Sequence, residues 1–354
     1  WLPLSQLGNP SNANDIWGWV DPENQDPYAI LGLDDGTAFI RITDPENPIP
    51  LPELEVDPPT ISVNMLPNDS PFSGKEGEFV TGNQLWERLQ RELLSDVALH
   101  VESLEGVGFK LSGRGELHLS ILIEKMRREG YEFQISPPTV IYKEEGGQRL
   151  EPYEEVTIRA QGDLMGSVIE RLGQRKGEML NMTQEGDETV VIYKIPTRGL
   201  LGYLCEFMTQ TKGMGQMTSR FLKYSTYVGE IRTRSNGVMI SNMTADTIAF
   251  ALYNLQDRGS LFMGPGQSVY EGQIIGEHSR EGDLVVNPAK GKKLTNVRAS
   301  GSDDAVVLTP FRKMSLEECM AYIMPGELLE ITPKSIRIRK VYLKESDRKI
   351  HKQI

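Results

Sequence analysis

Residues 107–135 read VGFKLSGRGELHLSILIEKMRREGYEFQI and mark out one α/β unit. Val107–Leu111 is predicted to form a strand, and Gly115–Arg128 has the apolar spacing of a helix. Gly130 is predicted to stop that helix, because glycine readily adopts the left-handed conformation found at helix C-termini. Tyr131–Ile135 then predicts a second strand.

The predicted helix is amphipathic. We expect Leu117, Ile121 and Leu122 to face the core. The last turn carries basic side chains, which suit the negative C-terminus of a helix.

The sequence on the N-terminal side completes a βαββαβ order, as in a ferredoxin-like split βαβ unit. Thr60–Leu66 alternates like a strand, and Thr81–Gln84 has the form of a capping box. Asn83–Ser95 follows as a predicted helix, and Val97–Glu102 as a predicted strand.

The same order of elements is predicted a second time after residue 147. The expected elements are strand Tyr153–Ala160, helix Asp163–Arg175, strands Glu178–Thr183 and Thr189–Ile195, helix Leu200–Thr211 and strand Gly215–Lys223.

The remaining residues have a mostly β pattern. The expected elements are strands Val238–Ser241, Thr247–Ala251 and Ser268–Gly276, a short helix at Leu252–Gly259, a helix Ser315–Ile323 capped by Ser315 and Glu318, and a strand pair Leu328–Thr332 and Ile336–Leu343.

These patterns predict an α+β protein: two tandem ferredoxin-like βαββαβ domains followed by a mostly β C-terminal domain. The predicted boundaries are 58–146, 147–225 and 226–354. Residues 1–57 are too few and too polar to bury a core alone. They are either the remnant of a larger domain or a partly disordered leader.

Charge is distributed unevenly along the 354 residues. Residues 1–57 hold 11 acidic residues against Arg41 alone, so they carry −10 of the net charge of −12. Residues 334–354 hold eight Lys and Arg against two acids, a local +6. The rest of the chain can therefore meet phosphate locally, although the whole is acidic.

Motifs for catalysis or cofactor binding are weak. Ser73-Gly74-Lys75 is followed by Glu76, and Asp69 stands where a phosphate-binding P-loop requires glycine, so we interpret this stretch as a surface loop. The four histidines and two cysteines have no metal-ligand spacing. We therefore expect no cofactor or metal and no catalytic residue in this chain. No apolar run is long enough to span a bilayer, and we expect no membrane partner.

The strongest polar pattern is residues 287–302, NPAKGKKLTNVRASGS. A basic loop rich in small donors suits contacts to phosphate and 2′-hydroxyl groups. Charge alone leaves an ordinary solvated loop equally open. The candidate RNA-binding residues here are Lys290, Lys292, Lys293, Asn296, Arg298, Ser300 and Ser302.

Two further basic features stand out. Arg337, Arg339 and Lys340 lie in a strand-like run, so the two arginines would share one face, expected to be exposed and to face phosphate. Arg114 lies between two glycines at a helix N-terminus, where it could meet an anion. The alternative is that those glycines only permit a tight junction and that His118 packs on the helix.

Several sequence segments resemble those of a known protein family. Ser112–Leu119 in the first unit and the tandem βαββαβ order resemble domains III and V of translational GTPases. Longer phrases resemble the TypA/BipA family: residues 68–77, LHLSILIEKMRREG at 117–130, LGQRKGEM at 172–179, YNLQDRG at 253–259 and DLVVNPAKGKKLTNVRASGSDD at 283–304.

That resemblance implies a ribosome-associated GTPase involved in stress adaptation and large-subunit assembly, and a cytoplasmic location. It implies that residues 287–302 reach toward large-subunit rRNA and the A-site tRNA. It also implies that GTP and Mg²⁺ belong to an N-terminal domain absent from this sequence, and that residues 44–57 match the end of β-barrel domain II. The candidate contacts at domain junctions or with the ribosome are Arg114, Arg175, Lys176 and Lys212.

We therefore expect a non-catalytic, ribosome-binding monomer without a DNA partner. The alternatives are a protein–protein interaction module, a fragment of a LepA-type elongation factor, and a small-molecule enzyme on the ferredoxin-like units. The absence of a clustered nucleophile or metal set in the sequence argues against the enzyme.

Overall fold

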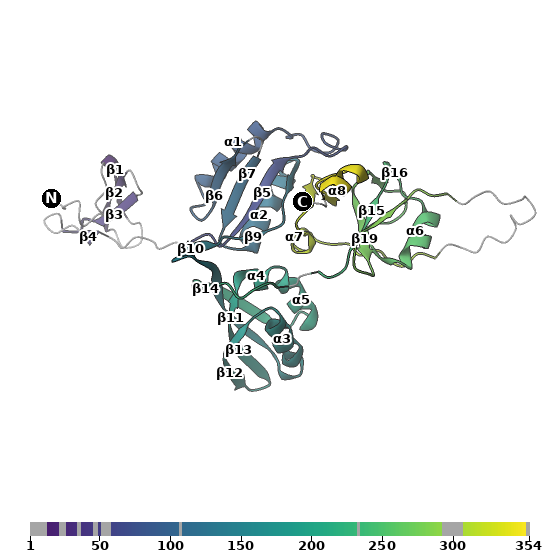
Figure 1. The fold of residues 1–354 in the computed structure, drawn as a ribbon. Helices are drawn as coiled ribbons and strands as arrows, with labels where there is room; N and C mark the ends of the chain where they lie inside the picture. The colour runs from purple at the N-terminus through teal and green to yellow at the C-terminus, as the bar shows by residue number, and fades with distance from the viewer. Residues whose placement is uncertain are drawn as a thin grey trace, which may run out of the picture. The chain divides into compact units, whose positions relative to one another are not determined.

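The computed structural model describes residues 13–20, 26–33, 37–44, 49–50, 58–105, 108–231, 234–291 and 307–351. The chain divides into two compact units, Trp1–Val56 and Asp57–Ile354. In the first unit, strands pair in chain order as an antiparallel sheet (Figure 1). They are β1 (Ala13–Val20), β2 (Pro27–Leu33), β3 (Thr37–Arg41) and β4 (Ile49–Pro50). The strand-like runs Tyr28–Leu33 and Thr37–Ile42 in the sequence predict β2 and β3, whereas β1 was not predicted.

The second unit begins with the predicted βαββαβ order. Its elements are β5 (Ile61–Pro67), α1 (Gly82–Leu93), β6 (His100–Leu104), β7 (Gly108–Gly113), α2 (Glu116–Arg128), β8 (Phe133–Ile135) and β9 (Thr139–Val140). The antiparallel strands lie in the order β8-β5-β7-β6. The predicted capping box is present: Thr81 accepts from the Gln84 N–H, and the Gln84 side chain accepts from the Thr81 N–H.

The buried face of α2 differs from the prediction. Leu117 and Ile121 are 57% and 59% exposed. Leu122 is buried as predicted, but the residues that pack with it in the core are Leu119, Ile123 and Met126. Apolar residues occupy two neighbouring stripes of this helix, and the stripe from Leu119 to Met126, about two turns long, is the one that packs in the core.

The next elements repeat the order around a second sheet. They are β10 (Lys143–Glu145), β11 (Gln148–Gln161), α3 (Gly162–Gln174), β12 (Glu178–Glu185), β13 (Glu188–Pro196), α4 (Thr197–Leu200), α5 (Tyr203–Gln210) and β14 (Gln216–Thr226). β11 pairs with both β13 and β14, and β12 lies at the edge next to β13. The predicted single helix 200–211 is broken, because Gly202 adopts a left-handed conformation between α4 and α5.

The C-terminal elements begin with a mixed sheet in the order β17-β19-β15-β20. They are β15 (Val238–Ser241), β16 (Ala245–Asp246), α6 (Ala249–Gln256), β17 (Gly259–Leu261), β18 (Ser268–Val269), β19 (Ile274–His278), β20 (Leu284–Val286), α7 (Leu316–Tyr322), β21 (Glu327–Ile331), β22 (Ile336–Lys340) and α8 (Glu345–His351). The strand predicted at 247–251 is wrong, since α6 starts at Ala249 and packs Leu252 and Leu255 in the core.

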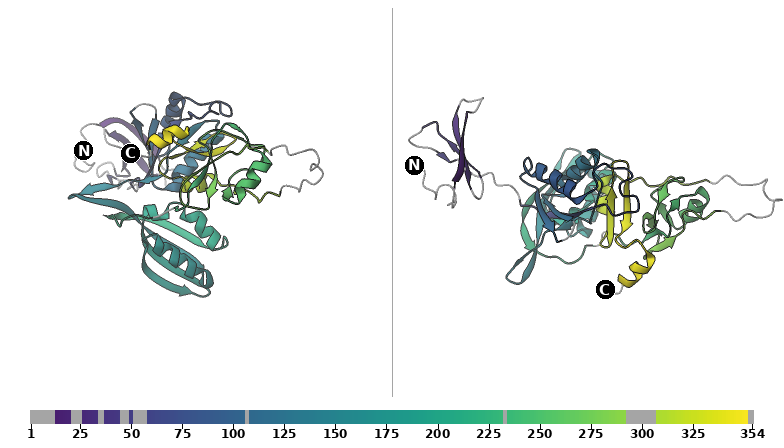
Figure 2. Two further views of the ribbon diagram at one scale, coloured as in Figure 1. Left: turned by 45° about the vertical axis from the view of Figure 1, so that its right-hand side comes forward. Right: turned by 90° about the horizontal axis from the view of Figure 1, so that it is seen from above.

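The last strand pair joins the first α/β unit. β21 pairs with β8, so one sheet runs β22-β21-β8-β5-β7-β6. In Figure 2, the yellow strands β21 and β22 lie beside the blue strands of the first α/β unit. Helix α7 contributes Leu316, Cys319 and Met320 to the same hydrophobic core. One continuous core therefore contains residues from two of the predicted domains.

Candidate RNA-contact site

The basic segment starts from an anchored turn. Val286, the last residue of β20, is buried. The carbonyl of Pro288 accepts a hydrogen bond from Ile248 N–H at 3.0 Å, and the Asn287 side chain accepts from Ala289 N–H at 2.9 Å. Lys290 follows directly and is exposed. The backbone is thus fixed up to the first cation of the segment.

The chain on the C-terminal side of the segment, at residues 307–309, is held by the same helix. Gln256 is the last residue of α6, and its side-chain oxygen accepts a hydrogen bond from Thr309 N–H at 3.0 Å. Its side-chain nitrogen donates to the Val307 carbonyl at 3.5 Å. Ile248 precedes the first residue of α6. The start of the basic segment, at Pro288, and the residues at 307–309 that follow it in the chain are therefore attached to opposite ends of α6.

The remaining predicted contacts of this segment lie outside the described residues. These are Lys292, Lys293, Asn296, Arg298, Ser300 and Ser302.

The expectation of an exposed basic face on β22 is wrong. Arg339 is only 2% exposed and its Nη2 lies 2.6 Å from Asp69 Oδ1. Arg337 pairs with Glu76 and with Glu330, the latter at 3.2 Å. The alternation was predicted correctly, but the strand lies beside acidic β21 rather than at a free surface.

Lys340 is paired in the same way. Its Nζ lies 2.9 Å from Glu327 and 2.8 Å from Asp283. Glu327 is its cross-strand neighbour on β21, as Glu330 is that of Arg337. These ion pairs satisfy the cations internally, so β22 offers few free charges to a phosphate.

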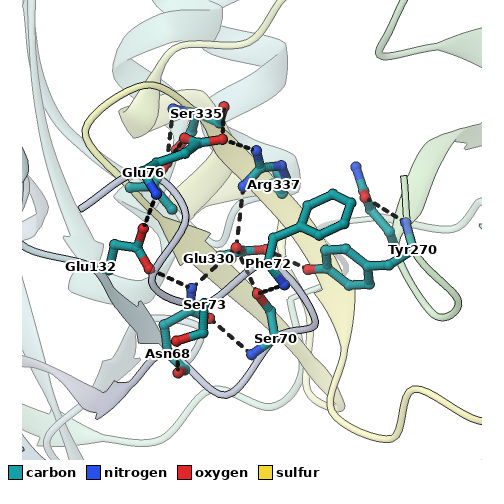
Figure 3. Close-up of polar contacts among 12 residues, drawn as sticks. Asn68, Ser70, Phe72, Ser73, Glu76, Glu132, Tyr270, Glu330, Ser335 and Arg337 are labelled. Carbon is teal, nitrogen blue, oxygen red and sulfur yellow. Dashed lines mark hydrogen bonds and ion pairs between the residues drawn. The ribbon is translucent and has the colours of Figure 1, made fainter. Parts of the chain in front are cut away.

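Figure 3 shows the network that surrounds Arg337. Glu330 is fully buried and accepts from Ser70 Oγ at 2.8 Å, from Asn68 Nδ2 at 3.2 Å and from the Tyr270 hydroxyl. Burial, and then the Glu330 carboxylate, hold the pKa of Tyr270 well above its usual value. The network therefore ties the 68–77 loop to β21.

The Ser73-Gly74-Lys75 loop has a structural role. The fully buried Glu132 carboxylate accepts backbone N–H groups from Gly74 at 2.7 Å and Glu76 at 2.9 Å, and a third from Gly77. These converging N–H groups are the kind of donors that a phosphate-binding loop offers to its ligand. Here an internal carboxylate occupies them, in agreement with the interpretation as a loop.

The Arg114 motif forms a local brace. The Thr60 hydroxyl donates to the Arg114 carbonyl at 2.7 Å, and Arg114 N–H donates to His118 Nδ1 at 3.3 Å. His118 Nε2 lies 2.6 Å from Asp96 Oδ2. The histidine is thus held within the fold, while the Arg114 side chain is exposed.

The three other predicted cations divide into two kinds. Arg175 donates to the Gly199 and Leu201 carbonyls at 2.9 and 3.0 Å and pairs with Glu206 at 2.9 Å, so it closes the α3–α4 junction. Lys176 and Lys212 are exposed and follow the ends of α3 and α5 with positive φ of 65° and 52°. Arg175 is therefore internal, and the two lysines remain accessible.

Sequence reasoning missed the joint at Gly202. Its N–H donates to Glu116 Oε2 at 2.8 Å, and a Cβ built on it would lie 2.4 Å from Ala321 Cβ. Three parts of the fold, carried by α2, α5 and α7, meet at this glycine. In the sequence, the contact was indicated only by the position of Glu116 within the 112–119 segment that carries the family resemblance.

Among the residues that the structure describes, no group of three or more His, Cys, Asp or Glu side chains is placed to hold a metal ion. Within the same residues, no helix has the length and apolar character to cross a membrane.

Comparisons with known proteins agree with this architecture. Residues 236–345 match the family described as TypA/BipA C-terminal domain, and residues 148–235 match the family described as Elongation factor G C-terminus. A solved structure from Thermus thermophilus is a distant match, with a TM-score of 0.34, 16% identity and coverage of 60% of this chain and 55% of that chain, too low to inform function.

Several curated relatives carry the name Large ribosomal subunit assembly factor BipA. Those of Salmonella typhimurium and Escherichia coli K12 are 52% identical over 92% of this chain and 54% of their own length. The Haemophilus influenzae relative is 51% identical over 92% of this chain and 53% of its own length. The chain spans about half the length of the relatives it matches, and it belongs to the TypA/BipA family.

Proposed function

We propose that this chain is a ribosome-binding portion of a TypA/BipA-type translational GTPase and that it acts in large-subunit assembly, in the cytoplasm where ribosomes are. The relatives' names support the ribosome as partner. GTP and Mg²⁺ would bind outside this chain, which would itself hydrolyse no nucleotide. It would act as a monomer.

We propose further that residues 287–302 contact large-subunit rRNA and the A-site tRNA. The observation that supports this is the attachment to α6 of the start of the segment, at Pro288, and of Thr309, which follows the segment in the chain. A basic segment that lies between two anchored points of the chain loses less entropy on binding than a free tail, because its reach is already limited. Lys290, exposed beside the anchored turn, would be its first phosphate contact.

Three exposed cations supplement this segment as candidate ribosome contacts: Arg114, Lys176 and Lys212. Arg337, Arg339 and Lys340 are not proposed as contacts, because their charges are already paired with carboxylates.

The decisive experiment is co-sedimentation with large subunits over a range of salt concentrations. Changing Lys290, Lys292, Lys293 and Arg298 together to Ala is expected to weaken binding at least about tenfold, about 1.4 kcal/mol. The slope of log affinity against log salt should also fall by roughly 0.7–0.9 per lost phosphate contact.

A matched control removes the same charge elsewhere. Lys223, Arg280, Lys313 and Lys344 are exposed, and their joint change to Ala should leave binding largely intact. Equal binding by the two variants would overturn the assignment of residues 287–302.

A second candidate function is protein–protein interaction, favoured by the edge strand β12. Its side chains are all exposed, among them Met179, Leu180 and Met182, and exposed apolar edges invite strand pairing. Capture of a partner that survives nuclease and high salt, and that is lost with Met182→Lys, would favour this function.

A further inference from the structure

A cavity of about 210 Å³ lies next to the Glu116–Gly202 joint. Apolar side chains form most of its wall, among them Leu117, Leu200, Leu204 and Met217. Leu117 and Leu204 are partly exposed, so the cavity opens where α2 and α5 present unpartnered apolar residues. A cavity of this make-up suits the hydrocarbon body of a small molecule.

Carboxyl groups also line this apolar cavity. Glu116 Oε2 is held by Gly202 N–H, but Glu116 Oε1 is buried and has no hydrogen-bond partner among the described residues. Glu154, on β11, is 9% exposed, and the Ser219 and Thr197 hydroxyls favour its charged form, but no ion pair among the described residues gives it a cation. Glu317 is a third lining carboxyl, whereas Arg114 is the single lining cation and its side chain is exposed.

An unpaired carboxylate in such surroundings is unfavourable. Burial raises the pKa of Glu116 against the opposing effects of Gly202 N–H and of the Arg175 charge, and the Glu317 charge raises it further. Burial raises the pKa of Glu154 against the opposing effects of the Ser219 and Thr197 hydroxyls. A buried charge is stabilised by an opposite charge with matching hydrogen bonds. A cation that donates hydrogen bonds is the kind of group that would complement Glu116 Oε1 and Glu154.

We propose that this cavity binds a compact apolar amine in its ammonium form. Its N–H groups would donate to Glu116 Oε1 and to the Glu154 carboxylate, and its hydrocarbon part would pack on Leu117, Leu204 and Met217. A neutral apolar molecule would leave the carboxyl oxygen without a donor, and an anion would be repelled. This site is separate from the proposed RNA contacts at 287–302.

The test is calorimetry on the whole chain at mildly alkaline pH, with three probes of similar shape: cyclohexylmethylamine, cyclohexylmethanol and cyclohexanecarboxylate. The amine should bind at a single site, at least about tenfold more tightly than the alcohol, and the carboxylate should not bind. Affinity for the amine should fall as the pH is lowered, because the carboxyl groups become protonated while the amine stays charged.

Glu116→Gln and Glu154→Gln should each weaken amine binding about tenfold. Glu87→Gln, on the exposed side of α1, is the matched control and should bind as the parent does. The proposal is overturned if the alcohol binds as tightly as the amine, if the amine does not bind at millimolar concentration, or if Glu154→Gln binds as well as the parent.

A chemical readout covers the case in which Glu116→Gln fails to fold. Cys205 lines the cavity, whereas Cys319 is buried. The amine should slow alkylation of Cys205 in the parent and not in Glu154→Gln. Cys205 also borders a neighbouring polar cavity that Glu154 does not line, so protection that persists in Glu154→Gln would assign the amine to that other cavity and overturn the proposal.

Discussion

The Glu116 carboxylate accepts a hydrogen bond from the backbone N–H of Gly202 at 2.8 Å, and this contact joins α2 of the first α/β unit to α5 of the second. Gly202 has φ of 69° and faces Ala321 on α7. Neither the contact nor its consequences are visible in a local sequence window, because the two residues are 86 positions apart in the chain.

Replacing Gly202 with Ala is expected to destabilise the Asp57–Ile354 unit by roughly 2–4 kcal/mol, since it adds positive-φ strain to a Cβ clash with Ala321. Urea unfolding measures the loss. Gly166→Ala is the control, because Gly166 lies inside α3 with open space around it. That change should stabilise by about 0.5–1 kcal/mol. Equal effects of the two substitutions on stability would contradict the assigned role of Gly202.

Replacing Leu329 with Ala should loosen the first α/β unit as well as the C-terminal hairpin. Leu329 is fully buried on β21 and is paired with Ile135 on β8. The expected loss is about 2–5 kcal/mol, and hydrogen exchange should accelerate in β8 and β5. The control Leu172→Ala, in the separate core of the second sheet, should accelerate exchange there first. Unchanged exchange in β8 would show that the hairpin is not integral to that sheet.

The stability given by Arg88 should depend on pH. Arg88 is buried and pairs with Glu92 and Glu129. The hydrogen bond from Arg88 lowers the pKa of Glu129, and Arg88 with Lys125 lowers that of Glu92 against the effect of burial. A carboxyl group whose pKa is lower in the folded than in the unfolded protein stabilises the fold at any pH above its unfolded pKa, about 4.3. This stabilisation is lost as the pH falls through the folded-state pKa.

The measurable consequence is a comparison of the parent with Arg88→Met by urea unfolding. The difference in free energy of unfolding between the two proteins should be largest at neutral pH and should shrink below about pH 4. Arg91→Met serves as control, since Arg91 donates to the Tyr131 hydroxyl rather than to a carboxylate. A difference that stays constant through the acid range would refute the ion-pair origin.

Arg337→Gln separates stability from RNA binding. Arg337 is paired with Glu330 and Glu76, so its loss leaves two carboxylates without their cation and should cost about 3–5 kcal/mol. The folded fraction should still sediment with large subunits as the parent does. If folded Arg337→Gln bound large subunits more weakly than the control variant in which Lys223, Arg280, Lys313 and Lys344 are changed to Ala, β22 would again be a candidate RNA contact.

Local sequence determined the elements whose hydrogen bonds close within a few residues. The capping boxes at Thr81 and Ser315, the helix stop at Gly130, strand β15 and the hairpin β21–β22 were all predicted close to their observed bounds. The basic segment 287–302 was also recognised from composition alone, although only Lys290 among its predicted contacts lies in the described residues.

Tertiary structure decided which surface each element presents. The buried stripe of α2, the pairing of β21 with β8, the burial of Arg339 among carboxylates and the Gly202 joint all depend on partners far away in the chain. Alternation and helical spacing give the faces of an element but not their neighbours, because burial is decided by whichever distant apolar or charged surface packs against them. The sequence alone thus determined the elements and the basic segment, and only the packing determined which cations remain free to meet a phosphate.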